Sequence, residues 1–298
     1  FGDYPYCVVM EAGEANLCQE VTQQHFAGRD WEKIKLVFTS LIHCANNLHE
    51  CGYIHGDLKP MNVLMTTKGN CKLIDFDAAC NLNNQEFVGS KSSSSYLPPE
   101  MFVDVDGKVL IRTFEKDMNS GKPHQDQNLS YSLVPASVSH DMWSLGVILF
   151  YLCTGFTLFA SSVDDNLCYQ KDMLSLLHWT NETLIEKTAQ ITDRYAKNLV
   201  SMLLNKNPSQ RPNCSRVLHH PFITGKEARR LPGESSEWDV FISYRVASDS
   251  DHAKLFYEAL TSAGLKVWWD VKCLEPGENW EKGFCQNLMS SDCLLCLI

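Results

Sequence analysis

The residues that decide the fold are His55-Gly-Asp-Leu-Lys-Pro-Met-Asn62 and, eighteen positions after Asp57, Asp75-Phe-Asp77. Together they supply three carboxylates, an ammonium group and an amide in a fixed order. Phosphoryl transfer needs a carboxylate to orient the attacking hydroxyl, a cation beside the transferred group, and oxygen ligands that hold Mg²⁺. We therefore expect Asp57 and Lys59 to be catalytic, and Asn62 and Asp75 to be the Mg²⁺ ligands.

This order of residues resembles the protein kinase family, whose catalytic loop reads H-R-D-x-K-x-x-N and whose metal loop reads D-F-G. A lone His-x-Asp would be explained more simply by a capping Asp beside a core His. The complete set in register argues against that reading. The resemblance implies ATP and Mg²⁺ as cofactors and proteins as substrates. Lys59, two residues after Asp57, implies Ser/Thr hydroxyls as the acceptors.

Further matches to the kinase family extend over residues 1 to 223. The segment Tyr6 to Gly13 resembles the strand and hinge that carry adenine, with Met10 at the gate of the pocket and the backbone of Glu11 and Gly13 bonded to the base. Leu64 resembles the apolar floor under adenine, although its residue type alone indicates only a core strand position.

Three further residues are expected to have structural roles. Pro98-Pro-Glu100 resembles the motif that closes the activation segment, and Asp141 begins a stretch that resembles the long buried helix of the family. Arg211 resembles the arginine that pairs with this glutamate. We expect a buried ion pair between Glu100 and Arg211, whose loss would strand a charge.

The chain departs from the family pattern in several places. Gly56 stands where the family has Arg, which puts control by an activation-loop phosphate in doubt. Asp77 replaces the Gly of D-F-G. The polar stretch from Asp104 to Ser139 reads as a surface insertion. Five serines, Ser90 and Ser92 to Ser95, read either as phosphoacceptors or as a flexible polar loop.

A second unit follows a linker that contains Pro232-Gly233. Strand and helix patterns alternate from Val240 onward, which predicts a parallel sheet. The stretches 238–245, 264–270 and 275–277 resemble a TIR domain, which implies homotypic or heterotypic association and, as an alternative, NAD⁺ as a ligand. The candidate pocket residues are Arg245, Asp270 and Gly277, although Asp270 could simply cap a strand end and Gly277 serve a turn.

The fold class we expect is α+β. A mostly helical kinase C-lobe, without an N-lobe in the chain, should span residues 1–223, a linker 224–236, and a partial α/β, flavodoxin-like TIR domain 237–298. The resemblance implies that the glycine-rich loop, the strand lysine and its partner glutamate of kinases lie upstream of Phe1. We therefore expect negligible catalysis by residues 1–298 alone.

Net charge, the longest apolar stretch and the cysteine spacing indicate which partners and which cell compartment to expect. A formal net charge of -10 argues against nucleic acid as a partner. The longest apolar stretch, Leu145 to Ala160, is shorter than the roughly 20 residues that span a bilayer. The 13 cysteines lack framework spacing and are expected to be reduced in a cytoplasmic protein, with Cys293 and Cys296 buried in a strand.

Three functions fit these observations. The first is a Ser/Thr protein kinase in intracellular signal transduction that is coupled to a TIR module. The second is a pseudokinase that serves as a scaffold for signalling partners, favoured by Gly56 and Asp77. The third is a TIR NAD⁺ hydrolase that is regulated by the kinase part.

Overall fold

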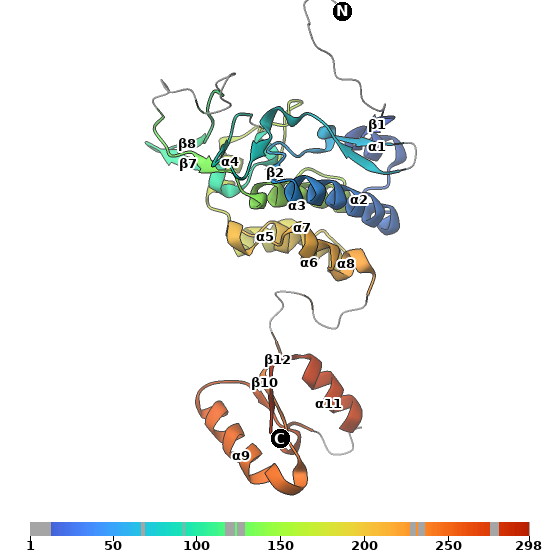
Figure 1. The fold of residues 1–298 in the computed structure, drawn as a ribbon, viewed down its shortest axis with the longest axis vertical. Helices are drawn as coiled ribbons and strands as arrows, with labels where there is room; N and C mark the ends of the chain where they lie inside the picture. Colours follow the sequence, from blue (N-terminus) through green and yellow to red (C-terminus); the bar gives the residue numbers. More distant parts are fainter. Residues whose placement is uncertain are drawn as a thin grey trace, which may run out of the picture. The chain divides into compact units, whose positions relative to one another are not determined.

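The computed structural model describes residues 13–66, 69–91, 93–116, 123, 129–226, 231, 236–274 and 280–297. The chain divides into two compact units, Phe1–Gly225 and Lys226–Ile298, which are described separately below (Figure 1). None of the helices in these described ranges is long and apolar enough to cross a membrane.

Two long helices, α2 (Trp31–Glu50) and α3 (Val138–Thr154), form the centre of the first unit. The buried side chains of α2 recur at helical spacing, and its N-cap Asp30 accepts a hydrogen bond from the backbone N–H of Lys33. Helix α3 is buried on almost every side and begins at Val138, three residues before the predicted start. Gly155, with a φ of 77°, ends it.

Shorter helices and small sheets cover the two central helices on opposite sides (Figure 1). Helix α6 packs tightly on α3, because a Cβ at Gly146 would lie only 2.8 Å from Leu203. The shorter helices of this unit are α1 (Leu17–Gln24), α4 (Gln170–Leu177), α5 (Asn181–Thr188), α6 (Arg194–Leu203), α7 (Cys214–Leu218) and α8 (Pro221–Thr224).

The strands of the first unit are short and all pair in antiparallel fashion. One sheet has the order β1-β3-β4; its strand β3 directly follows the loop His55–Asn62, and β4 leads to Asp75. Its strands are β1 (Ala15–Asn16), β3 (Val63–Met65) and β4 (Cys71–Leu73). Three two-stranded pairs complete the unit: β2 (Tyr53–Ile54) with β5 (Cys80–Asn81), β6 (Phe87–Val88) with β9 (Val134–Pro135), and β7 (Phe102–Val105) with β8 (Lys108–Ile111).

The prediction that residues 104 to 139 form a surface insertion is wrong at both of its ends. The hairpin β7–β8 buries Phe102 and Val109, and the backbone N–H of Phe114 donates to the carbonyl of Gly89. At the other end, β9 pairs with β6. The segment is therefore built into the unit through apolar residues that its polar composition conceals.

The second unit contains a three-stranded parallel sheet of order β11-β10-β12 with helices on both faces (Figure 1). The parallel pairing confirms the prediction from alternating strands and helices. Phe241 stacks on Trp268 and contacts Phe284 on one face, whereas Ile242 packs with Ala253 on the other. The elements are β10 (Trp238–Ser243), α9 (Val246–Ser262), β11 (Val267–Trp268), α10 (Asp270–Cys273), α11 (Trp280–Met289) and β12 (Ser291–Cys296).

The cysteine prediction holds only in part. No disulfide joins cysteines within the described residues. Cys293 and Cys296 lie on strand β12 as expected, but both are exposed rather than buried. Strand β12 is an outer strand of this sheet, so its side chains face neighbours on fewer sides than those of the central β10.

Candidate active site

The catalytic loop is fixed in place by Asp141, which helix α3 presents from the core. Its carboxylate is fully buried and accepts hydrogen bonds from the backbone N–H groups of His55 (2.8 Å) and Gly56 (3.0 Å). His49 on α2 adds a contact from Nε2 at 2.9 Å. Burial alone would raise the pKa of Asp141, but the His49 hydrogen bond and charge, with the His55 N–H, hold it below its usual value. The carboxylate therefore stays ionised and anchors the loop.

Gly56 is required by the backbone at this point of the loop. Its φ of 75° is unfavourable for residues with a Cβ, and a Cβ there would lie 2.4 Å from the carbonyl oxygen of Ala78. An arginine could not be accommodated in this conformation. The departure from the family pattern at Gly56 thus coincides with close contact between two loops.

Asp57 and Asn62 form a direct polar pair. Nδ2 of Asn62 donates to the backbone oxygen of Asp57 at 2.9 Å and to its carboxylate at 3.3 Å. The turn Pro60–Asn62 brings them together, and both residues are buried to more than nine-tenths. Because Nδ2 makes these bonds, the amide oxygen of Asn62 is the atom that remains for a cation.

Lys59 lies beside this pair with three polar partners. Its ammonium donates to Oγ of Ser93 at 2.8 Å and lies 3.3 Å from a carboxylate oxygen of Asp165 and 3.8 Å from one of Asp57. These contacts hold one cation between two carboxylates, next to the carboxylate expected to orient a hydroxyl.

Asp75 follows β4 and is held near Asn62 by the backbone. The N–H of Ile74 donates to the carbonyl of Asn62 at 3.1 Å. Asp75 has a left-handed φ of 64°, and its two carboxylate oxygens accept from the ammonium of Lys91 at 2.8 and 3.0 Å. The Lys91 hydrogen bond lowers the pKa of Asp75. This carboxylate already binds a cation, and with the Asn62 amide oxygen it provides the oxygen donors that suit Mg²⁺.

The serine run is neither an exposed loop nor a set of accessible phosphoacceptors where the structure describes it. Ser93, Ser94 and Ser95 are 6%, 2% and 5% exposed. The backbone N–H of Leu167 donates to Oγ of Ser94, and the N–H of Ser95 donates to the carbonyl of Asp165. The reading as a flexible polar loop is therefore wrong for these three serines, and their burial does not favour the reading as phosphoacceptors. Ser90 is half-buried, and Ser92 lies outside the described residues.

Two of the residues expected to bind adenine lie together. A Cβ at Gly13 would contact the side chain of Leu64 at 3.0 Å, and β1 pairs with β3 so that Asn16 faces Leu64. Leu64 is half-buried. Met10 and Glu11 lie outside the described residues, so the rest of the expected adenine site is not seen.

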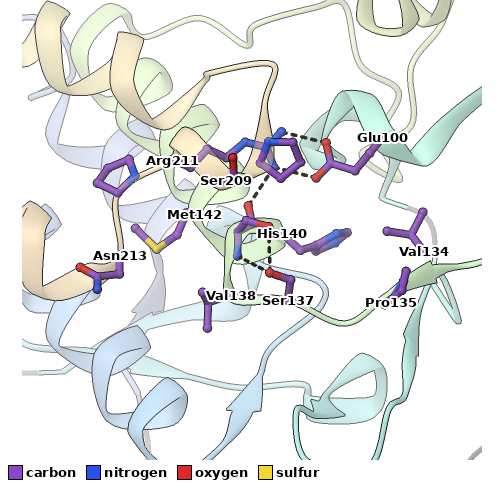
Figure 2. Close-up of a pocket in the computed structure, with 13 residues that line it drawn as sticks. Glu100, Val134, Pro135, Ser137, Val138, His140, Met142, Ser209, Arg211 and Asn213 are labelled. Carbon is purple, nitrogen blue, oxygen red and sulfur yellow. Dashed lines mark hydrogen bonds and ion pairs between the residues drawn. The ribbon is translucent and has the colours of Figure 1, made fainter. Parts of the chain in front are cut away.

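The expected ion pair between Glu100 and Arg211 is present. Nη1 and Nη2 of Arg211 donate to the two Glu100 oxygens at 2.7 and 2.8 Å, and the Arg211 side chain is fully buried. The pair borders a pocket of about 500 Å³ (Figure 2). The other residues that line it are Val134, Pro135, Ser137, Val138, Ser139, His140, Met142, Pro208, Ser209, Pro212 and Asn213. No residue of the catalytic loop lines this pocket, which supports a structural role for the pair.

Of the candidate residues of the second unit, Asp270 makes contacts within its own neighbourhood. The carboxylate of Asp270 accepts from the hydroxyl of Tyr244 (3.0 Å) and the backbone N–H of Val271 (2.8 Å). These contacts favour the local capping role that the sequence left open. Arg245 is exposed, and Gly277 lies outside the described residues.

Sequence reasoning missed four residues that complete the site. His49 binds Asp141, Ser93 and Asp165 bind Lys59, and Lys91 binds Asp75. Only Lys91 carried a usable signal, as the one cation inside the serine run that follows the metal-loop carboxylates. The others lie 34 to 106 positions from their partners, where no local pattern connects them.

Comparisons with known proteins agree with this arrangement. A model of the protein kinase domain matches residues 3–118 and 131–223, and a TIR domain model matches residues 240–298. A calcium and calcium/calmodulin-dependent serine/threonine-protein kinase from Pisum sativum is 30% identical over 228 residues, which cover 74% of this chain and 34% of that protein. Serine/threonine-protein kinase CHK1 from Saccharomyces cerevisiae is 24% identical over 229 residues, which cover 74% of this chain and 37% of that protein.

A human SNF-related serine/threonine-protein kinase is 23% identical over 248 residues, which cover 82% of this chain and 27% of that protein. The chain thus spans about a third of the length of the curated relatives it matches.

Proposed function

The chain belongs to the protein kinase family, and we propose that it transfers the γ-phosphoryl group of ATP to Ser/Thr hydroxyls of proteins in signal transduction. The observation that carries the proposal is the arrangement of Asp57, Lys59 and Asn62, which contact one another within 4 Å while the backbone holds Asp75 beside Asn62. These are the groups that positioning and charge neutralisation in phosphoryl transfer require.

Each residue has a defined task in this proposal. The Asp57 carboxylate accepts a hydrogen bond from the substrate hydroxyl and orients its oxygen toward the phosphorus. The Lys59 ammonium stabilises the negative charge of the transferred group. Asn62 and Asp75 would hold Mg²⁺, which supplies charge neutralisation at the nucleotide phosphates when it is bound. Asp141 is a positioning residue, because it acts only through the backbone of His55 and Gly56.

Ser/Thr acceptors are supported by two observations. Lys59 stands two residues after Asp57, and its ammonium is held by Ser93, so that it lies beside the carboxylate that would receive the hydroxyl. The named relatives are serine/threonine kinases. For the nucleotide, we propose that Gly13 and Leu64 contribute to an adenine site with Met10 and Glu11.

The TIR unit is proposed to couple the kinase to signalling partners through protein association. The leading alternative for the whole molecule is a scaffold without phosphoryl transfer. It is favoured by the engagement of Asp75 with Lys91 and by the presence of Asp77 in the metal loop. No contact within the described part of the second unit favours NAD⁺ over a protein partner.

The deciding experiment measures transfer of labelled phosphate from Mg-ATP to a generic Ser/Thr substrate by the protein at its natural length. We expect Asp57→Ala to lower the rate by about 10²–10⁴, and Asp75→Asn to lower it through loss of the metal carboxylate. Glu186→Ala removes an exposed carboxylate on α5 and serves as the control. Equal labelling by all four proteins would refute the kinase proposal and leave the scaffold.

A further inference from the structure

Lys91 occupies the carboxylate that the proposed reaction reserves for a divalent cation. Its ammonium lies 2.8 Å from Oδ1 and 3.0 Å from Oδ2 of Asp75, and 3.3 Å from Oδ2 of Asp77. One cation thus faces three carboxylate oxygens. Asp77 is one of the residues that depart from the family pattern, so part of this arrangement is particular to this chain.

The position of Lys91 is set by the chain on both sides of it. Before it, the carbonyl of Gly89 accepts from the backbone N–H of Phe114 at 3.1 Å, and Gly89 is buried. After it, Oγ of Ser93 accepts from the ammonium of Lys59 at 2.8 Å. The Lys91 side chain is about one-third exposed, so it can leave Asp75 for water while the flanking contacts persist.

Two cations cannot share one carboxylate at these distances without strong repulsion. A divalent ion bound directly to Asp75 would lie about 2 Å from its oxygens, within a few ångströms of the Lys91 ammonium. Asp77 strengthens the hold of the lysine but is 79% exposed, so it remains close to water. Uptake of the cation and release of Lys91 are therefore coupled events at one carboxylate.

We propose that Lys91 is an internal counterion of Asp75 that competes with the divalent cation, and that Asp77 strengthens its hold. The proposal rests on the assignment of Asp75 as a metal ligand in the proposed function. Lys91 is then a positioning residue that acts through Asp75. It sets the affinity of the site for the cation. Because Lys91 lies two residues before Ser93, which binds the Lys59 ammonium, it also links cation uptake to the position of Lys59.

The test measures the affinity of the whole chain for Mn²⁺, used alone as the probe, by the electron paramagnetic resonance signal of the free ion. Lys91→Met removes the competing charge and should tighten binding at the Asp75 site about three- to tenfold. Lys91→Arg keeps the charge and should stay within about twofold of the natural protein. Lys108→Met removes an equal charge from an exposed position of the hairpin β7–β8 and controls for net charge.

Asp75→Asn identifies the site in each background, and the melting temperature checks that every variant folds. Tighter binding with Lys91→Met alone, lost when Asp75→Asn is added, supports the proposal. Equal affinity of Lys91→Met and the natural protein, with binding still dependent on Asp75, overturns the counterion role and leaves the proposed function intact. If Asp75→Asn has no effect on Mn²⁺ affinity, or if Mn²⁺ does not bind, the metal assignment fails and the inference with it.

Discussion

Individual residues of the active site are constrained by very local geometry. Gly56 and Gly69 both have a φ of 75°, but only Gly56 faces a neighbour: its Cβ would lie 2.4 Å from the Ala78 oxygen, whereas nothing lies within 4 Å of a Cβ at Gly69. Substitutions at Gly56 and Gly69 therefore separate the free-energy cost of the left-handed backbone conformation from the cost of the steric clash with Ala78.

We predict that Gly56→Ala lowers the free energy of unfolding by about 2–5 kcal/mol, because a left-handed φ and a clash combine. Gly69→Ala should cost about 1–2 kcal/mol from the φ alone. Urea denaturation followed by circular dichroism gives both values. Similar losses for the two variants would contradict the close contact between Gly56 and Ala78.

The Glu100–Arg211 pair gives a second prediction at this scale. Arg211→Ala should lower the free energy of unfolding by about 3–5 kcal/mol, since it leaves the Glu100 carboxylate, 23% exposed, without its bidentate partner. Arg216→Ala, on the exposed side of α7, should change it by less than about 0.5 kcal/mol. A loss of transfer activity with unchanged stability in Arg211→Ala would argue against the structural role.

At the scale of elements, capping side chains decide where the short helices begin. His220 is the N-cap of α8: its Nδ1 accepts from the backbone N–H of Phe222, and its Nε2 contacts Asn198. Burial lowers the pKa of His220 to about 4. The neutral form is the one that fits, because a protonated Nδ1 could not accept the Phe222 hydrogen bond.

This cap predicts a pH dependence of stability. Because the folded pKa lies below the ordinary value of about 6.5, the contribution of His220 is present above that pH and is lost as pH falls toward 4. The loss should reach about 2–3 kcal/mol. His220→Asn keeps an acceptor without titrating and should flatten this part of the curve, while the exposed neighbour His219→Asn should not. Identical curves for both variants would contradict the assignment.

Elements also show where a sequence pattern was sufficient. Apolar residues recur at helical spacing from Trp31 to Leu48 and again from Tyr195 to Leu204. These patterns agree with the bounds of α2 and α6 to within about two residues. The same reasoning failed for the segment 104–139. Its apolar anchors, such as Val109 and Phe114, are separated by polar residues, and its strands β8 and β9 contact α4 and β6, which lie outside the segment.

At the scale of the whole molecule, the chain has two cores that do not share residues. The first is built on α2, α3 and α6, and the second on the sheet β11-β10-β12. Leu149 is fully buried in the first core, and Trp268 is fully buried in the second unit, stacked at 4.3 Å on Phe241. Separate cores indicate that each unit unfolds by itself.

We predict two thermal transitions in calorimetry. Leu149→Ala should lower the midpoint temperature of one transition, because it reduces the free energy of unfolding of the first unit by about 2–5 kcal/mol. Trp268→Ala should lower the midpoint temperature of the other, because it reduces the free energy of unfolding of the second unit by about 3–5 kcal/mol. A shift of both transitions by either variant would show that the two units unfold as one.

The sequence by itself determined the kinase motif, the long helices, the parallel sheet of the second unit and the residues Asp57, Lys59, Asn62 and Asp75 as candidates. Motif spacing and hydrophobic periodicity are local, so they can be read within a few turns of chain. Only the tertiary structure decided that His49 and Asp141 anchor the loop, that Asp165 reaches Lys59, and that Lys91 lies on Asp75. The two members of each pair lie on loops or helices that are distant in the sequence and meet only when the chain folds. No local sequence pattern therefore indicates which side chains come within about 3 Å of one another.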